Sequence, residues 1–87
     1  MASYRVGIKP SASKELERLP GQLIARVIER LEALASDPRP RGCKKLKGGD
    51  NAWRIRIGDY RAVYTIDDKR LLVDITRIRH RSEVYEP

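Results

Sequence analysis

The chain has 87 residues and a mass of 10.0 kDa, which suits one small domain with a modest core and excludes a large internal cavity. Its formal net charge of +7 and isoelectric point near 10.0 indicate an acidic partner such as nucleic acid. Cys43 is the only cysteine, so an internal disulfide is impossible, and no apolar run approaches the roughly 20 residues of a membrane span. We therefore expect a single domain over residues 1–87, cytoplasmic and without membrane contact.

The first half of the chain predicts one strand and a helical hairpin. Weak alternation over residues 4–9 indicates a short strand. Ser11 or Ser13 can cap the helix that follows. Its apolar residues recur at helical spacing, at Ala12, Leu16 and Leu19. Beyond Pro20, a longer apolar stripe predicts a second helix over residues 22–36, and two amphipathic helices this close together are typical of an αα-hairpin.

The second half predicts a loop and three strands. Residues 37–51 are basic and then glycine-rich, and we interpret them as a solvated loop. Short apolar runs over residues 53–57, 60–66 and 71–78, separated by turns, predict an antiparallel meander. The expected fold class is α+β, with an N-terminal strand, a helical hairpin and a three-stranded antiparallel meander forming one small sheet. The element order is β-α-α-β-β-β, with the helices on one face.

Arginines alternate with apolar residues along the predicted strands. Since alternate side chains of a strand point to opposite faces, residues 53–57 bury one tryptophan and two isoleucines and expose two arginines. This strand and its neighbours contribute one cationic set: Arg54, Arg56, Arg61 and Arg79. The charge is also lopsided, with six basic and five acidic residues in 1–37 but thirteen and seven in 38–87. The pattern predicts a rigid phosphate-binding surface, although an ordinary polar strand face is the simpler alternative.

The residues available for chemistry are Arg, Lys, Tyr and one His, and we expect no metal and no cofactor. One His and one Cys cannot supply a zinc cluster, and no P-loop or positioned Ser-His-Asp triad is present. What remains suits metal-free RNA cleavage, in which the 2′-hydroxyl attacks the adjacent phosphodiester. Arginine binds phosphate but is a poor base, so Tyr85 or His80 would have to move protons. The simpler alternatives are a surface histidine and a tyrosine that seals the end of the sheet.

Two segments resemble the RelE branch of the RelE/ParE toxin superfamily. One is residues 53–64, with its Gly-Asp-Tyr-Arg turn, and the other is residues 77–85, with its Arg-Ser-Glu-Val-Tyr ending. The resemblance covers nearly the whole chain and implies a RelE-like fold. It also implies the toxin of a type II toxin–antitoxin pair, an endoribonuclease that cleaves mRNA in the ribosomal A site without metal and so inhibits translation.

The resemblance also implies which residues form the site. The expected catalytic residues are Arg61, Arg79 and Tyr85, with His80 added from its chemistry. The expected RNA- and phosphate-binding residues are Arg54, Arg56, Arg81, Lys44, Lys45 and Lys47. The positions of Arg54 and Arg56 are lysine in the best-known members. Arginine preserves phosphate binding there but disfavours a role as base, which moves proton transfer to Tyr85 or His80.

Three partners are implied in the same way. These are an acidic RelB-like antitoxin, the 70S ribosome and its mRNA, with DNA contacted only through the antitoxin complex. Two alternatives stay open, because a fold does not fix a function. The first is a ParE-like poison of DNA gyrase, and the second is a catalytically weakened nucleic-acid-binding relative.

Overall fold

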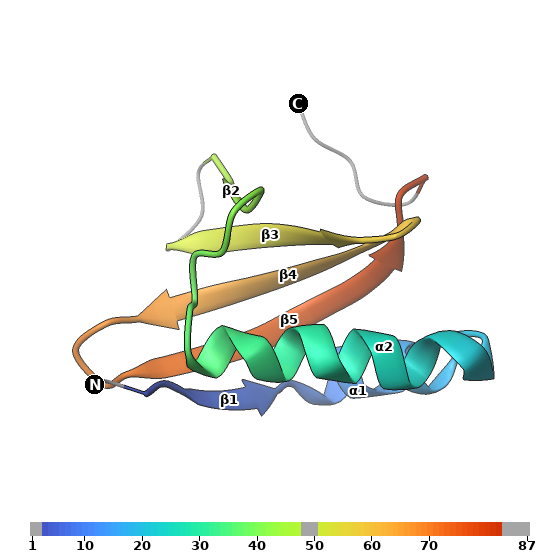
Figure 1. The fold of residues 1–87 in the computed structure, drawn as a ribbon, viewed down its shortest axis with the longest axis horizontal. Coiled ribbons are helices and arrows are strands. Elements are labelled where there is room, and N and C mark those ends of the chain that lie inside the picture. The colour runs from blue at the N-terminus through green and yellow to red at the C-terminus, as the bar shows by residue number, and fades with distance from the viewer. Residues whose placement is uncertain (1–2, 48–50, 83–87) are drawn as a thin grey trace.

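The computed structural model describes residues 3–47 and 51–82 of the chain. Its elements in chain order are β1 (Arg5–Ile8), α1 (Pro10–Glu17), α2 (Gly21–Glu32), the 3₁₀-helix η1 (Ala33–Ala35), β2 (Lys44–Lys45), β3 (Ala52–Ile57), β4 (Tyr60–Asp67) and β5 (Leu72–His80). The strands form one sheet in the order β1-β5-β4-β3-β2, and α2 runs along one face of it (Figure 1). The expected α+β class, with two helices and a meander, is confirmed.

The core lies between α2 and the inward face of the meander. Alternation along β3 buries Ile55 and Ile57, and α2 buries Val27 and Leu31, four positions apart on one helix face. The other buried residues come from the helices, the turn between them, β4 and β5: Ala12, Leu19, Leu34, Ala62, Tyr64, Ile66, Val73, Ile75 and Ile78. The outward face of the meander is therefore left to the polar side chains between them.

The sheet differs from the expected one at both edges. Strand β1 pairs with β5 in parallel, with Val6 opposite Val73, so the sheet is mixed. At the other edge Lys44 and Lys45 form β2, antiparallel to β3, and the expectation of a loop at these residues is wrong. Both pairings depend on distant partners, which local alternation does not reveal. The second helix becomes 3₁₀ after Glu32, and the last strand continues beyond residue 78.

A β-bulge between β4 and β5 changes which side chains of β5 point towards the core. Val63 is opposite Arg77, but Tyr64 is opposite Ile75, so Thr76 is the extra residue. The Thr76 hydroxyl donates to the carbonyl of Val63 at 3.1 Å. Because of this irregularity Ile75 and Ile78 are both buried although they are three residues apart. The arginines at the end of β5 consequently alternate with core residues.

Helix α1 covers the edge of β5 where β1 ends. Its first residue is Pro10, and no side chain caps it, so the expectation of a serine cap is wrong. Ser11 instead donates its hydroxyl to the Thr76 carbonyl at 3.3 Å. Glu15, one turn later, accepts the backbone N–H of Ile78 at 2.8 Å. Side chains of α1 thus bond groups of β5 that a further strand would otherwise pair.

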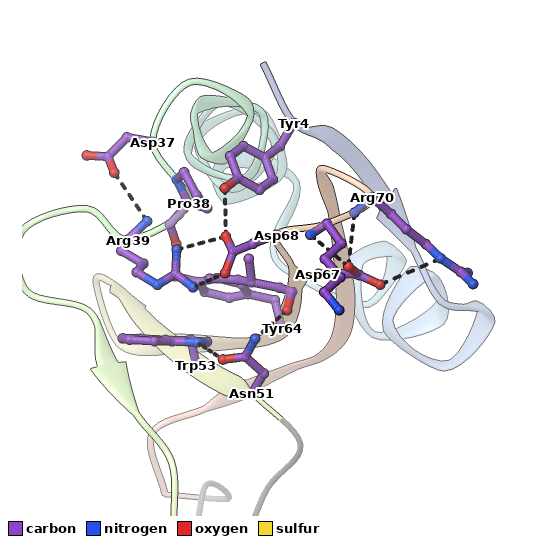
Figure 2. A network of polar contacts seen from close by, with 12 residues as sticks. Tyr4, Asp37, Pro38, Arg39, Asn51, Trp53, Tyr64, Asp67, Asp68 and Arg70 are labelled. Atoms are coloured by element: carbon purple, nitrogen blue, oxygen red, sulfur yellow. Dashed lines mark hydrogen bonds and ion pairs between the residues drawn. The ribbon is translucent and has the colours of Figure 1, made fainter. Parts of the chain in front are cut away.

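A polar network joins the segment before β1, the loop after η1 and the β4–β5 turn at the end of the sheet where that turn lies (Figure 2). Arg39, in the loop after η1, donates both terminal nitrogens to Asp68 in the β4–β5 turn, at 3.2 and 2.8 Å. The Tyr4 hydroxyl donates to the same carboxylate at 2.7 Å. These bonds lower the pKa of Asp68 to about 2, the bond from Arg39 contributing most. Beneath them, Tyr64 donates its buried hydroxyl to the Pro38 carbonyl at 2.8 Å.

Within residues 3–47 and 51–82, neither helix is long and apolar enough to cross a membrane.

Candidate nucleic-acid interface

Three arginines stand side by side across the outward face of the meander. Arg56 of β3 is in register with Arg61 of β4, which is in register with Arg79 of β5. Neighbouring strands lie about 4.8 Å apart, so the three α-carbons span roughly 10 Å. We call Arg56, Arg61 and Arg79 the outer-face row. The sequence predicted that these residues share a face, and the strand register agrees.

The turn between β3 and β4 holds the first two members of the row. Arg56 donates its Nε to the Gly58 carbonyl at 3.3 Å, and Arg61 donates Nη1 to the same oxygen at 3.2 Å. Arg61 also donates to the carbonyl of Tyr60 at 3.1 Å. Gly58 has a φ of 61°, the left-handed region that favours glycine. A single carbonyl therefore draws two guanidinium groups together and orients both.

The electrostatics of the row centre on Arg61. Its pKa is lowered, first by desolvation and then by repulsion from neighbouring cations, which Asp59 partly opposes. Those cations are Arg56, Arg54 and Arg81. The pKa of a guanidinium lies so far above neutral that Arg61 remains a cation at pH 7 despite this lowering and cannot serve as a base. An anion bound here would relieve this repulsion, which makes the site suited to phosphate.

Arg79 is already engaged by a carboxylate. Its Nε donates to Oε2 of Glu15 at 2.7 Å, while Oε1 of Glu15 accepts the Ile78 N–H. The Arg79 side chain is 38% exposed and that of Glu15 is 19% exposed. Glu15 thus fixes the guanidinium at the sheet edge and leaves its Nη atoms for other contacts. Glu15 was not predicted as a site residue from the sequence; its only local signal is its spacing of four from Ser11 on α1.

His80 lies on the other face of β5 from the row. It is in register with Tyr60, and the two rings meet edge to face with centroids 5.4 Å apart. The Ser82 N–H donates to Nδ1 of His80 at 3.2 Å, so this nitrogen is an acceptor. His80 and Arg79 both line a cavity of about 180 Å³ beside α1. Tyr85, the other expected proton carrier, lies outside the described residues.

The remaining expected phosphate-binding residues surround β3. Lys44 is in register with Arg54 and so shares its face, whereas Lys45 lies over the ring of Trp53, 5.9 Å from its centroid. Lys47 is exposed in the turn after β2. Arg81 donates its backbone N–H to the Asp59 carbonyl at 2.7 Å and lies beside the Gly58 turn. In the described part of the chain, no three His, Cys, Asp or Glu side chains are grouped so that they could hold a metal.

Comparison with known proteins identifies the class to which this fold and surface belong. Residues 6–85 match the sequence profile of the family described as the ParE toxin of the type II toxin–antitoxin system, parDE. Toxin RelE of Mycobacterium tuberculosis is 35% identical over 83 residues, which cover 94% of this chain and 86% of that protein. The chain therefore belongs to the RelE/ParE superfamily of type II toxins.

Solved structures agree with this assignment. The toxin–antitoxin complex RelBE2 from Mycobacterium tuberculosis contains a chain that superposes with a TM-score of 0.82 at 33% identity, covering 95% of this chain and 97% of that one. The archaeal RelE–RelB complex from Pyrococcus horikoshii OT3 gives a TM-score of 0.82 at 31% identity, with 94% and 99% covered. Both relatives were thus solved in complex with an antitoxin.

Proposed function

We propose that this toxin is a ribosome-dependent endoribonuclease that cleaves mRNA in the A site. The observation that carries the proposal is the outer-face row, in which three arginines of adjacent strands stand in register. Arginine suits the binding of phosphate because its planar fork donates two parallel hydrogen bonds. The similarity to proteins named RelE supports the choice of RNA as substrate.

The proposed reaction needs only groups that proteins of this composition possess. The 2′-oxygen attacks the adjacent phosphorus, a base takes the 2′-proton, and the bond to the 5′-oxygen breaks as an acid protonates it. The outer-face row would stabilise the charge that develops on the phosphoryl oxygens. We assign Arg54 and Arg81 to positioning the backbone and leave proton transfer to Tyr85 or His80, since guanidinium stays protonated.

Induced expression with primer-extension mapping of transcripts tests this function. The wild-type chain should produce new cuts within translated codons. Arg61→Ala should reduce the cleavage rate about 10²- to 10³-fold, the usual cost of losing one preorganised charge stabiliser. Arg70→Ala, an exposed arginine at the opposite end of β4, is the matched control and should cut normally. Growth arrest with intact transcripts would contradict the proposal.

The same mapping separates the two candidates for proton transfer. If Tyr85 carries the proton, Tyr85→Phe should abolish cutting while His80→Ala retains it, and the reverse should hold if His80 does. Because His80 lies across the strand from the outer-face row, we expect Tyr85→Phe to have the larger effect.

A second function has one observation in its favour, because the matched family is described as a ParE toxin of the parDE system. A ParE-like chain would poison DNA gyrase instead of cutting RNA. Two results together would establish this alternative. Purified toxin would inhibit supercoiling by gyrase, and cells that express the toxin would keep their transcripts intact. A catalytically weakened relative would bind RNA and do neither.

We also propose an acidic RelB-like antitoxin as the cognate partner, encoded beside the toxin. The RelE–RelB complexes of similar chains support this, and the net charge of +7 favours an acidic binding segment. Action on the ribosome would put the activity in the cytoplasm, and contact with operator DNA would come through the antitoxin. Co-purification from the native operon tests the partner, and recovery of the toxin alone would count against it.

A further inference from the structure

We propose that an open cavity between α2, the loop after η1 and β3 is a second phosphate-binding site, which receives the sugar–phosphate backbone of RNA. The cavity has a volume of about 440 Å³. Its lining consists of Arg30, Arg41, Gly42, Ile55, Arg56 and Gly58. Three of these residues are arginines and none is acidic. The choice of RNA as ligand rests on the proposed function.

Two of the three arginines have no counter-ion among the residues that the structure describes. In the described part of the chain, the side chains of Arg30 and Arg41 make no hydrogen bond or ion pair. Arg39, two residues before Arg41, shows the contrast, because Asp68 binds both of its terminal nitrogens (Figure 2). Cations that converge without a carboxylate repel one another, and a bound anion offsets that repulsion.

The cavity adjoins the outer-face row. Arg56 lines the cavity and also shares the Gly58 carbonyl with Arg61. Strand β2 pairs only with Trp53 and Arg54, so among the described residues no strand covers the edge of β3 beyond them. A phosphate chain that lies on the row can therefore continue around this edge towards the C-terminal turn of α2, where Arg30 lies.

The lining fits a phosphate backbone better than a protein segment. Its one apolar side chain, Ile55, is 2% exposed, and Gly42 and Gly58 offer none. Protein partners rely on buried aromatic or aliphatic anchors, which this cavity cannot receive. Phosphate oxygens need only the charged forks that Arg30 and Arg41 supply.

Salt-dependent RNA binding by the full chain tests the site. The probes are a 2′-O-methylated RNA single strand and a 2′-O-methylated hairpin, neither of which the toxin can cleave. Arg30→Gln/Arg41→Gln should raise Kd and reduce the slope of log Kd against log[KCl] by about 1.4 on the single strand, since each lost phosphate contact contributes about 0.7. Arg30→Lys/Arg41→Lys should restore most of the slope, because charge is retained.

The matched control is Arg5→Gln/Lys14→Gln, which removes the same charge from β1 and α1 and should leave the slope near that of wild type. A slope change confined to the hairpin would assign the site to helical RNA, and one on the single strand would assign it to mRNA. The proposal is overturned if the cavity and control variants have equal slopes on both probes, or if the wild type binds neither. Loss of antitoxin affinity with an unchanged RNA slope would likewise overturn it, in favour of a protein site.

These outcomes are distinct from failure of the proposed function. The probes are uncleavable and no ribosome is present, so the slopes do not depend on the nuclease reaction. A chain that cuts no mRNA yet shows the predicted slope change would retain the second site and lose the endoribonuclease assignment.

Discussion

Glu15 joins α1 to the end of β5 through one carboxylate. Glu15→Ala removes both bonds and leaves the part-buried Ile78 N–H without its acceptor. We expect the free energy of unfolding to fall by about 1–3 kcal/mol, mostly from this N–H. Arg79 is too exposed for the ion pair to add more than about 1 kcal/mol. Glu15→Gln keeps an acceptor for the N–H and should lose less, as measured by urea denaturation.

Glu17→Ala provides the control for this measurement, because Glu17 ends the same helix and is exposed. Equal destabilisation by Glu15→Ala and Glu17→Ala would show that the carboxylate does not hold the strand edge. Residue by residue, the local alternation indicated which side chains of β3 face outward. It could not indicate that Arg79 meets a carboxylate 64 positions away.

At the scale of elements, Asp68 links the residue before β1, the loop after η1 and the β4–β5 turn (Figure 2). Its pKa in the folded chain, about 2, lies below the ordinary 3.8, so the unfolded chain binds a proton first as pH falls. The stabilisation is therefore present above pH 4 and is lost between about pH 4 and pH 2. Asp68→Asn should flatten the loss of unfolding free energy across this window, measured by urea denaturation at each pH.

Glu29→Gln is the control for the acid window, because Glu29 is an exposed carboxylate of α2. It should leave the pH dependence close to that of wild type. An unchanged profile in Asp68→Asn would show that the network does not stabilise the folded chain. The experiment measures the contribution of bonds between segments outside the helices and strands, and such bonds cannot be inferred from helix or strand propensity.

The sequence predicted those elements whose evidence is local. The stripe of Val27 and Leu31 and the alternation of Ile55 and Ile57 follow from one helix or strand meeting one core. The parallel pairing of β1 and the two-residue strand β2 depend on partners that only the folded chain places beside them. In addition, β2 consists of two lysines, and lysine has a low propensity for strands. The cavity arginines could not be predicted for the same reason, because the residues that surround them are distant in the sequence. Taken alone, Arg30 looks like an ordinary solvent-exposed residue of a helix.

At the scale of the whole molecule, the two ends of the meander carry different charge. The end at the Gly58 turn holds all three members of the outer-face row and Arg81. The opposite end holds a cavity of about 800 Å³ whose lining mixes acidic and basic residues: Asp67, Asp68, Asp74, Lys69 and Arg70. An acidic partner is therefore attracted to one end of the sheet more than to the other.

Two charge-matched variants test whether the antitoxin responds to this polarity or to net charge alone. Arg56→Gln/Arg61→Gln and Lys69→Gln/Arg70→Gln each lower the net charge from +7 to +5. If local field governs encounter, the first should slow antitoxin association about tenfold or more at low salt, and the second should slow it little. Stopped-flow measurements over a range of KCl concentrations provide the rates. Equal slowing by both variants would mean that total charge steers the partner. If only the first variant slows association, and the difference disappears at high salt, the charge that attracts the antitoxin lies at the Gly58 turn.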